Sequence, residues 1–523
     1  MHKIVDLFAG AGGMSLGFIQ QGQFKVAAVV ENNQNAVKTY KQNHSEKDII
    51  YESDITKLDF YDLKKRVGNV SVIIGGPPCQ GFSNANRQRS TLISGNNLLI
   101  KKFAEAIEKI NPSVFVMENV ATLQSTTHKF FVTNDDNGSI SKLGLVPETE
   151  IVSLCDNNPD GPEMLELLQN SKNVEDLLFS DKIFNSIKLI QRYYDNEKLS
   201  GYFIKHSKEI INCLKEYKAE FAGDVINSLL QKYTRNALDI FREQKISDEG
   251  KEAIEKIVEF QKTLRLIQEL RRNNVAFTPI QQDGNKIVTT IQAYSVYTYL
   301  EKFFQKLGYD LYPDTVNAVE FGVAQERKRF VLVGVKKETL EHSSFNILKE
   351  KSLRKTVFDV IGDLYNIEPN YIACEESIEN NNFSMSENAL NDSNRIFNHT
   401  TTKTTENSLK MFKVLKQGQN FHDLPEELKK TYSKSERTQK TIYMRISENE
   451  PAGTVVNVRK SMWIHPIKNR AVSIREAARL QSFPDSYIFC GTKDSQYQQV
   501  GNAVPPLLAK AIAQAVARVL DNK

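Results

Sequence analysis

Short apolar runs alternate with amphipathic stretches over the first 120 residues of the chain. Between the runs, Met14–Gln20, Asn32–His44 and Leu98–Ile110 carry the spacing of helices, and Pro112 follows the last of them. This alternation predicts βαβ units and a parallel sheet, and therefore an α/β fold. The apolar runs predicted as strands are Ile4–Phe8, Lys25–Glu31, Asp48–Tyr51, Val70–Ile74 and Val114–Met117.

The pattern changes after about residue 126, where apolar residues recur at helical spacing between charged ones. The chain has no proline between Pro162 and Pro279, which favours long helices. The α/β pattern returns with a helix predicted at Tyr294–Gly308 and strands at Thr315–Phe321 and Phe330–Val335. The helices predicted in the insertion are Glu175–Tyr194, Lys208–Tyr217, Val225–Arg242 and Glu252–Arg272.

Composition shifts and this pattern divide the chain into five segments. Residues 341–464 are irregular and rich in Asn, Ser, Thr and Lys, whereas the last sixty residues are compact again. We predict one α/β domain built from residues 1–125, 286–340 and 465–523. A helical insertion at 126–285 and a small irregular domain at 341–464 interrupt it.

Composition is that of a globular protein, with 40% hydrophobic and 25% charged residues among 523. The formal net charge is only +4, so a polyanionic partner must be met by a local basic surface. No apolar run approaches the ~18 residues needed to cross a bilayer, and a strand rather than a signal peptide begins the chain. Five scattered cysteines predict neither disulfides nor a metal site, so we expect a reducing cytoplasmic setting and no membrane contact. They are Cys79, Cys155, Cys213, Cys374 and Cys490.

A glycine-rich turn follows the first predicted strand. Its Gly10–Gly13 run lacks the dinucleotide fingerprint, because Ser15 stands where the third glycine belongs. Glu31 ends the second strand, where a carboxylate can accept ribose hydroxyls, and Asp54 ends the third, where it could accept an adenine amine. The pattern favours a nucleoside cofactor without a pyrophosphate, and S-adenosylmethionine is the common one. A plain turn with surface acids is the alternative.

Cys79 lies in a loop at the carboxyl end of the fourth strand, where open α/β sheets bind ligands. Pro77 and Pro78 restrict the backbone just before the thiol. Glu118 ends the next strand, so a nucleophile and an acid would share one pocket. A buried structural cysteine is the alternative.

These runs, taken in order, resemble the motifs of the cytosine carbon-5 DNA methyltransferases. The resemblance covers residues 1–125, about 290–340 and 464–523, and implies a Rossmann-like, S-adenosylmethionine-dependent methyltransferase sheet. Residues 341–464 would then be the target-recognition domain. The matching runs are the Phe8–Gly13 turn, Glu31, Asp54, Pro77–Cys79, Glu118–Val120, Gln325–Arg329, Arg475–Pro484 and Gly501–Pro506.

The resemblance implies a covalent mechanism on the cytosine ring. The Cys79 thiolate would add to carbon 6 while Glu118 acts at ring nitrogen 3, and the resulting enamine carbon would attack the sulfonium methyl. Of Arg327 and Arg329, one would contact the carbonyl oxygen of the base and the other would fix the loop. Amino-methylating enzymes usually place an aromatic residue where Cys79 stands, so the cysteine favours carbon methylation.

The family pattern also implies a cofactor pocket. Phe8 would pack on the adenine, Glu31 would accept from the ribose and Asp54 from the adenine amine. The remaining residues assigned to the pocket are Gly10, Gly12 and Leu16 beside the methionine arm, Pro77, and Asn502 with Ala503 from the C-terminal part.

Double-stranded DNA is the expected partner, and the target cytosine must leave the duplex to react. The loop Gln80–Asn97 would close over the flipped base, with hinges at Gly81 and Gly95. Lys429–Arg445 is a basic segment expected to contact phosphates and a groove, although a solvated loop is the alternative. The loop residues assigned to DNA are Gln80, Ser83, Arg87 and Arg89.

The chain departs from the family pattern at three places. Ala324 replaces the usual proline before Gln325, Asn96-Asn97 replaces an Arg-Asn pair, and the insertion lengthens the stretch after Glu118. A tRNA-methylating branch shares the motifs but carries a Cys-Phe-Thr signature that this chain lacks, and a degenerate DNA-binding subunit would not need Cys79 and Glu118. No chromatin-reader or other regulatory extension precedes the predicted catalytic domain, so a prokaryotic or phage modification enzyme is expected. A cognate restriction endonuclease or defence-system protein is expected as a further partner. The insertion receives no specific role.

Overall fold

A computed structural model divides the chain into two compact units. One comprises residues 1–79, 98–124 and 303–523, and the other residues 80–97 and 125–302. The residues described are 1–44, 48–78, 96–125, 128–156, 165–166, 168, 174–194, 197–220, 228–339, 345–347, 354–372, 377–379, 390–429 and 435–521.

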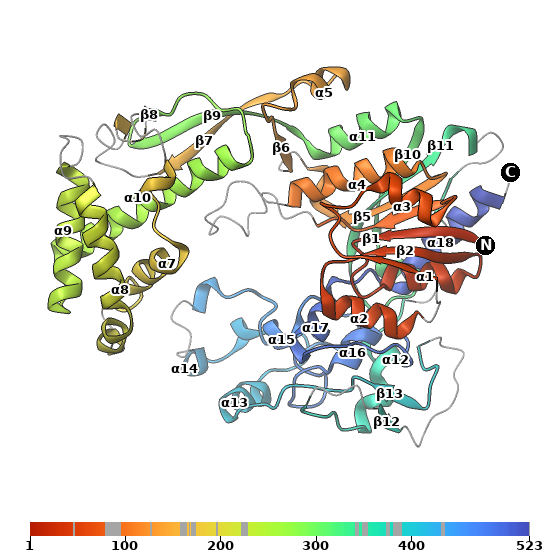
Figure 1. Ribbon diagram of the computed structural model, residues 1–523. Coiled ribbons are helices and arrows are strands. Elements are labelled where there is room, and N and C mark those ends of the chain that lie inside the picture. Colours follow the sequence, from red (N-terminus) through yellow and green to blue (C-terminus); the bar gives the residue numbers. More distant parts are fainter. Residues whose placement is uncertain are drawn as a thin grey trace. The chain divides into compact units, whose positions relative to one another are not determined.

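A seven-stranded sheet forms the centre of the first unit, in the order β10-β11-β5-β4-β1-β2-β3 (Figure 1). Strands β1 to β5 run parallel, which confirms the predicted βαβ pattern. β11 is antiparallel to both β5 and β10; it can pair with β10 in this way because only a short connection joins the two strands. The strands are β1 (His2–Leu7), β2 (Phe24–Val30), β3 (Ile50–Glu52), β4 (Val72–Gly75), β5 (Val114–Val120), β10 (Tyr309–Asn317) and β11 (Lys328–Lys336).

One predicted strand is displaced. The strand expected at Thr315–Phe321 is the end of β10, and Ala318–Phe321 forms a 3-10 helix instead. Glu320 accepts a hydrogen bond from the backbone N–H of Asn317 at 3.2 Å, which closes this turn and directs the chain into β11.

Helices pack on this sheet and enclose its core. α1 packs against α18, and Gly17 permits the close approach, because a Cβ there would lie 2.4 Å from the carbonyl oxygen of Pro506. The stretch Lys493–Asp521 is apolar and long enough to cross a membrane, yet 72% of its apolar window is buried, as in a core helix. The helices are α1 (Gly13–Gln21), α2 (Gln34–Asn43), α3 (Phe60–Val67), α4 (Asn96–Ile110) and α18 (Pro506–Asp521); α11 (Val296–Lys306) crosses the boundary between the two units.

The C-terminal half of this unit consists of short elements joined by long loops. Its core gathers around Trp463, which is 2% exposed, and Phe483, which is fully buried. The elements are α12 (Val357–Ile361), β12 (Ser377–Glu379), β13 (Arg395–Phe397), α13 (Glu406–Val414), α14 (Glu426–Lys429), α15 (Val458–Ser461), α16 (Ile474–Leu480) and α17 (Lys493–Asn502).

The second unit combines long helices with a four-stranded sheet in which β9 pairs with β6, β7 and β8, all antiparallel. The amphipathic pattern predicted the helices but did not reveal these strands. Gln261 joins α10 to the segment just before α7, since its side chain bonds the backbone of Phe179 and Leu177 at 2.8 Å each. The elements are β6 (Lys129–Phe131), α5 (Asn137–Lys142), β7 (Glu148–Cys155), α7 (Asp181–Ile190), α8 (Leu199–Glu220), α9 (Ser228–Glu243), α10 (Asp248–Arg272), β8 (Gln281–Asp283) and β9 (Lys286–Ser295).

Candidate active site

The sequence-predicted residues follow the carboxyl ends of neighbouring parallel strands. Phe8 comes directly after β1, with a φ of 60°, and Glu31 comes directly after β2. Asp54 lies two residues beyond β3, and Pro77 lies two beyond β4. Because these strands are parallel, their carboxyl ends share one edge of the sheet, where α/β proteins bind ligands.

The glycine turn is closed on one side and open on the other. Glu31 accepts hydrogen bonds from the N–H of Gly10 at 2.8 Å and from that of Asn33 at 2.7 Å. A Cβ on Gly10 would meet nothing within 4 Å, whereas one on Gly12 would lie 2.9 Å from both Tyr40 and Tyr487. The open side at Gly10 therefore lies next to the Glu31 carboxylate.

Asp54 remains a charged acceptor near this edge. Its Oδ1 accepts from the backbone N–H of Thr56 at 3.0 Å and from the Thr56 hydroxyl at 2.6 Å. These hydrogen bonds hold the pKa of Asp54 below its usual value. Because its side chain is 41% exposed, it can still accept a bond from a ligand amine.

Glu118 and Arg329 form an ion pair on two adjacent strands. The Nε of Arg329 lies 2.8 Å from Oε1 of Glu118, and the two side chains are only 17% and 13% exposed. On the β4 side, a Cβ on Gly76 would lie 3.2 Å from Oε2 of Glu118. Asn119 donates to the carbonyl of Pro77 at 2.9 Å, so β5 also holds the start of the loop that leads to Cys79.

Arg327 has a different environment, although only Lys328 separates it from Arg329. It is 2% exposed and donates to the carbonyls of Val455 at 2.8 Å, Ala503 at 3.0 Å and Gly501 at 3.2 Å. Burial, together with the charge of Arg329, lowers the pKa of Arg327 to about 9. Arg327 therefore joins β11 to the C-terminal part of the chain, while Arg329 faces Glu118.

Of the remaining predicted site residues, three lie among the described residues and the others do not. Ala503 is held through its carbonyl by Arg327, Asn502 is exposed at the end of α17 and accepts from Gln498 at 2.7 Å, and Leu16 packs at the edge of the C-terminal core. The nucleophile and the DNA-loop residues Cys79, Gln80, Ser83, Arg87 and Arg89 lie outside the described residues.

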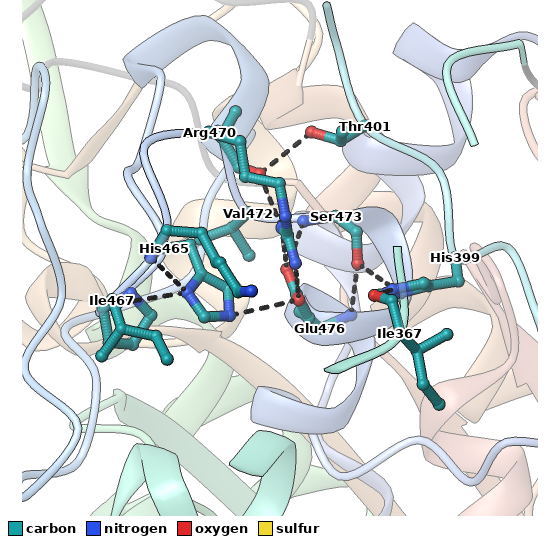
Figure 2. Close-up of polar contacts among 12 residues, drawn as sticks. Ile367, His399, Thr401, His465, Ile467, Arg470, Val472, Ser473 and Glu476 are labelled. Carbon is teal, nitrogen blue, oxygen red and sulfur yellow. Dashed lines mark hydrogen bonds and ion pairs between the residues drawn. The ribbon is translucent and has the colours of Figure 1, made fainter. Parts of the chain in front are cut away.

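Sequence reasoning missed a buried ion pair that organises the C-terminal half (Figure 2). Arg470 donates to both oxygens of Glu476, at 2.6 and 2.9 Å, and both side chains are buried. His399 accepts a hydrogen bond from Ser473 at 3.0 Å and donates to the carbonyl of Ile367 at 3.0 Å, if its ring is neutral. Burial acts to raise the pKa of Glu476, but Arg470 outweighs it and holds that pKa well below the ordinary value.

The predicted basic DNA segment Lys429–Arg445 is wrong at its C-terminal end. Arg445 is 5% exposed, and Tyr443 is buried against Phe421. The guanidinium of Arg445 donates to carbonyl groups at the C-terminal end of α13 and in the loop after Ile464, so it is not available to phosphates. These carbonyls belong to Phe412, Leu415, His465, Pro466 and Lys468. Residues 430–434 lie outside the described residues.

The sequence pattern of the C-5 cytosine-specific DNA methylase family matches residues 2–156 and 285–518. The chain belongs to this family. It is accordingly a DNA (cytosine-5-)-methyltransferase, and its membership of a methyltransferase family implies a methyl donor in general and DNA as the substrate.

Curated relatives extend over the whole chain. The type II methyltransferase M1.HphI of Haemophilus parahaemolyticus is 24% identical over 522 residues, which cover 99% of this chain and 87% of that protein. M.DdeI of Desulfomicrobium norvegicum is 25% identical and covers 99% of this chain and 89% of that protein. M.HgiDI of Herpetosiphon aurantiacus reaches 42% identity, but over only 23% of this chain and 37% of that protein.

One solved structure supports the fold. A candidate DNA modification methyltransferase encoded within an E. coli prophage aligns with a TM-score of 0.54 at 19% identity, covering 100% of both chains. The predicted Rossmann-like methyltransferase fold is thereby confirmed.

Proposed function

We propose that this enzyme transfers the methyl group of S-adenosylmethionine to carbon 5 of a cytosine flipped out of double-stranded DNA at a specific sequence. The reaction would pass through a covalent adduct on Cys79. We further propose that the enzyme is the modification component of a restriction-modification or phage-defence system, because two relatives that span the whole chain are named type II methyltransferases.

The ion pair between Glu118 and Arg329 is the observation that carries this proposal. Arg329 holds Oε1 of Glu118, and no described residue bonds Oε2, which lies beside Gly76 and would meet ring nitrogen 3 of a flipped cytosine. The guanidinium of Arg329, on the same edge, would contact the carbonyl oxygen of the base. Arg327 would act as a brace, because its terminal nitrogens Nη1 and Nη2 donate to backbone carbonyls.

The covalent chemistry follows from the cytosine ring, whose carbon 5 is too weak a nucleophile to take a methyl group unaided. Addition of the Cys79 thiolate to carbon 6, with a proton given to nitrogen 3 by the Glu118 carboxyl in its protonated form, makes carbon 5 an enamine carbon. S-adenosylmethionine supplies the electrophilic methyl group. After transfer, a base removes the carbon-5 proton and the thiolate leaves by β-elimination.

The glycine turn would hold the cofactor. Glu31 would accept from the ribose hydroxyls and Asp54 from the adenine amine, with Phe8 packed against the adenine ring. Gly10 offers open space for the ligand, whereas Gly12 is backed by aromatic side chains. Arg327 would keep Ala503 in place beside the methionine arm through the Ala503 carbonyl.

The family match leaves residues 157–284 uncovered, in support of an inserted domain near the predicted 126–285. We assign residues 1–125, 286–340 and 465–523 to the catalytic domain. Residues 341–464 would read the target sequence, with Gln80, Ser83, Arg87 and Arg89 on the loop that closes over the flipped base.

Plasmid DNA from cells that express the wild type or Cys79→Ser tests the activity. Bisulfite sequencing should show 5-methylcytosine at one sequence with the wild type and none with the variant. Wild-type DNA without new 5-methylcytosine would refute the activity, and methylation at unrelated sequences would refute the specificity. A second test uses DNA that contains 5-fluorocytosine, which should trap the wild type covalently. An adduct that survives Cys79→Ser would show that another nucleophile acts.

A further inference from the structure

Asp6 is a buried carboxyl beneath the glycine turn that the methylation chemistry does not use. It is the penultimate residue of β1 and is 1% exposed. The Ser15 hydroxyl in α1 donates to its Oδ2, and the hydroxyl of Tyr40 in α2 donates to Ser15 at 2.6 Å. A chain of hydrogen bonds therefore connects β1, α1 and α2 under the turn.

None of the described groups that act on this carboxyl is a cation. Glu31, which shares the turn, raises the pKa of Asp6, and Asp6 in turn raises those of Tyr40 and Tyr487. His44 stacks on Tyr40 with ring centroids 4.0 Å apart, but burial lowers its pKa to about 4, so it is neutral near pH 7. Burial is the largest effect on Asp6 and raises its pKa to about 7, although the bond from Ser15 opposes it.

The same network supports the turn itself. Tyr487 donates to the carbonyl of Ala11, and Gly12 lies against the Tyr40 ring with no room for a Cβ. Glu31 accepts from the N–H of Gly10 on the other side. The negative charge of Glu31 acts on Asp6 across the turn. A charged ligand bound at the turn is therefore expected to change the pKa of Asp6 as well.

We propose that Asp6 is a specificity-determining residue that lets the pocket distinguish the positively charged methyl donor from its neutral thioether product. The cation of the donor would favour the ionised carboxyl, so Asp6 would release its proton to solvent on binding. After methyl transfer the cation is gone, and Asp6 would take a proton back from solvent. This inference rests on the proposed use of S-adenosylmethionine. Asp6 would act through its charge and is a positioning residue, since nothing places it against the reacting atoms.

Calorimetric titration of the full chain measures this proton exchange. The heat of binding is compared between phosphate and Tris buffers near pH 7, for S-adenosylmethionine and for S-adenosylhomocysteine. The two ligands share every other ionisable group, so their difference isolates the sulfonium charge. The wild type should release a fraction of a proton with the methyl donor and markedly less with the product. Its preference for the donor should increase between about pH 6 and pH 8, by at most about tenfold per pH unit.

Two variants and a control separate this role from a structural one. Asp6→Asn keeps an acceptor for Ser15 and should abolish the difference in proton release and the pH dependence of the preference. Asp59→Asn, at the exposed N-cap of α3, should behave like the wild type. Ser15→Ala removes the donor that lowers the Asp6 pKa, so the midpoint of the pH dependence should move upward.

The outcomes are distinct. Equal proton release for both ligands, or a difference that survives Asp6→Asn, would overturn the proposal while leaving the cofactor assignment intact. If Asp6→Asn does not fold, an unchanged midpoint in Ser15→Ala would overturn it instead. Failure of the wild type to bind either ligand would refute the proposed cofactor itself.

Discussion

Two pairs of a glutamate and an arginine in the same unit have opposite environments. Glu118 and Arg329 are 13% and 17% exposed and share one contact at the edge of the sheet. Glu476 is fully buried, Arg470 is 8% exposed, and two contacts join them. The residue types alone therefore do not say whether an ion pair serves chemistry or architecture.

The two glutamates differ in which of their carboxylate oxygens are bonded to the described residues. Both oxygens of Glu476 are bonded to Arg470, and Oε2 also accepts from the N–H of Ser473 at 2.7 Å. Glu118 is held at Oε1, and within the described part of the chain its Oε2, next to Gly76, has no hydrogen-bond donor. Substitutions in the two pairs should therefore separate loss of activity from loss of stability.

Glu118→Gln should have the largest effect, and mainly on activity. Loss of an acid that acts on the base is expected to lower kcat by about 10²- to 10⁴-fold. The free energy of unfolding should fall by less than in Glu476→Gln, because the Glu118 and Arg329 side chains keep some contact with solvent and share a single contact. Methyl transfer and urea unfolding measure the two quantities, with Glu105→Gln on α4 as the control. A large loss of stability without loss of kcat would reverse the assignment of the two pairs.

Glu476→Gln should reverse this result. It leaves the buried guanidinium of Arg470 without a counter-charge, so the free energy of unfolding should fall by about 3–5 kcal/mol. Urea unfolding monitored by circular dichroism measures the change. At a temperature where the variant is folded, its kcat should stay close to that of the wild type. A decrease below about 1 kcal/mol would show that the pair does not organise this half of the unit.

The buried histidines beside Glu476, and Glu476 itself, should also make the free energy of unfolding depend on pH. Burial lowers the pKa of His465 to about 4 and lowers that of His399, so both are neutral in the folded protein and charge more readily when unfolded. Stability should be complete above about pH 6.5 and should fall as pH drops towards 4, by up to about 3 kcal/mol for His465. The lowered pKa of Glu476 adds a further loss below about pH 4.3. Unfolding across this range should show a smaller slope in His465→Gln, and an unchanged slope would contradict a contribution from His465.

Gly76→Ala should have the smallest effect and should act through Glu118. The added Cβ would lie 3.2 Å from Oε2 of Glu118, so the carboxyl must shift by a few tenths of an ångström. Such a displacement in an active site is expected to cost about tenfold in kcat. Gly201→Ala in α8, where a Cβ would meet nothing within 4 Å, is the matched control. Equal activity of both variants would show that Glu118 tolerates the shift.

The sequence predicted the parallel strands and the residues at their carboxyl ends, because apolar periodicity and glycine or proline punctuation are local signals. Glu31, Asp54 and Glu118 were found in this way. The strands β7 and β9 of the second unit were not, because their pairing partners lie more than a hundred residues apart in the chain. The ion pair of Arg470 with Glu476 was also missed, since nothing local distinguishes a buried arginine from a solvated one.

Local sequence was thus enough to specify which chemical groups this protein brings to the edge of its sheet. How each group is used depends on the tertiary structure. Arg327 and Arg329 are two residues apart, yet one is buried among carbonyls and the other faces Glu118. Arg445, expected at the DNA, is buried and donates to the backbone carbonyls of Leu415 and His465. Burial and the need to satisfy buried carbonyls arise from contacts between distant segments, and these contacts decide which arginine is enclosed by carbonyls and which faces a carboxylate.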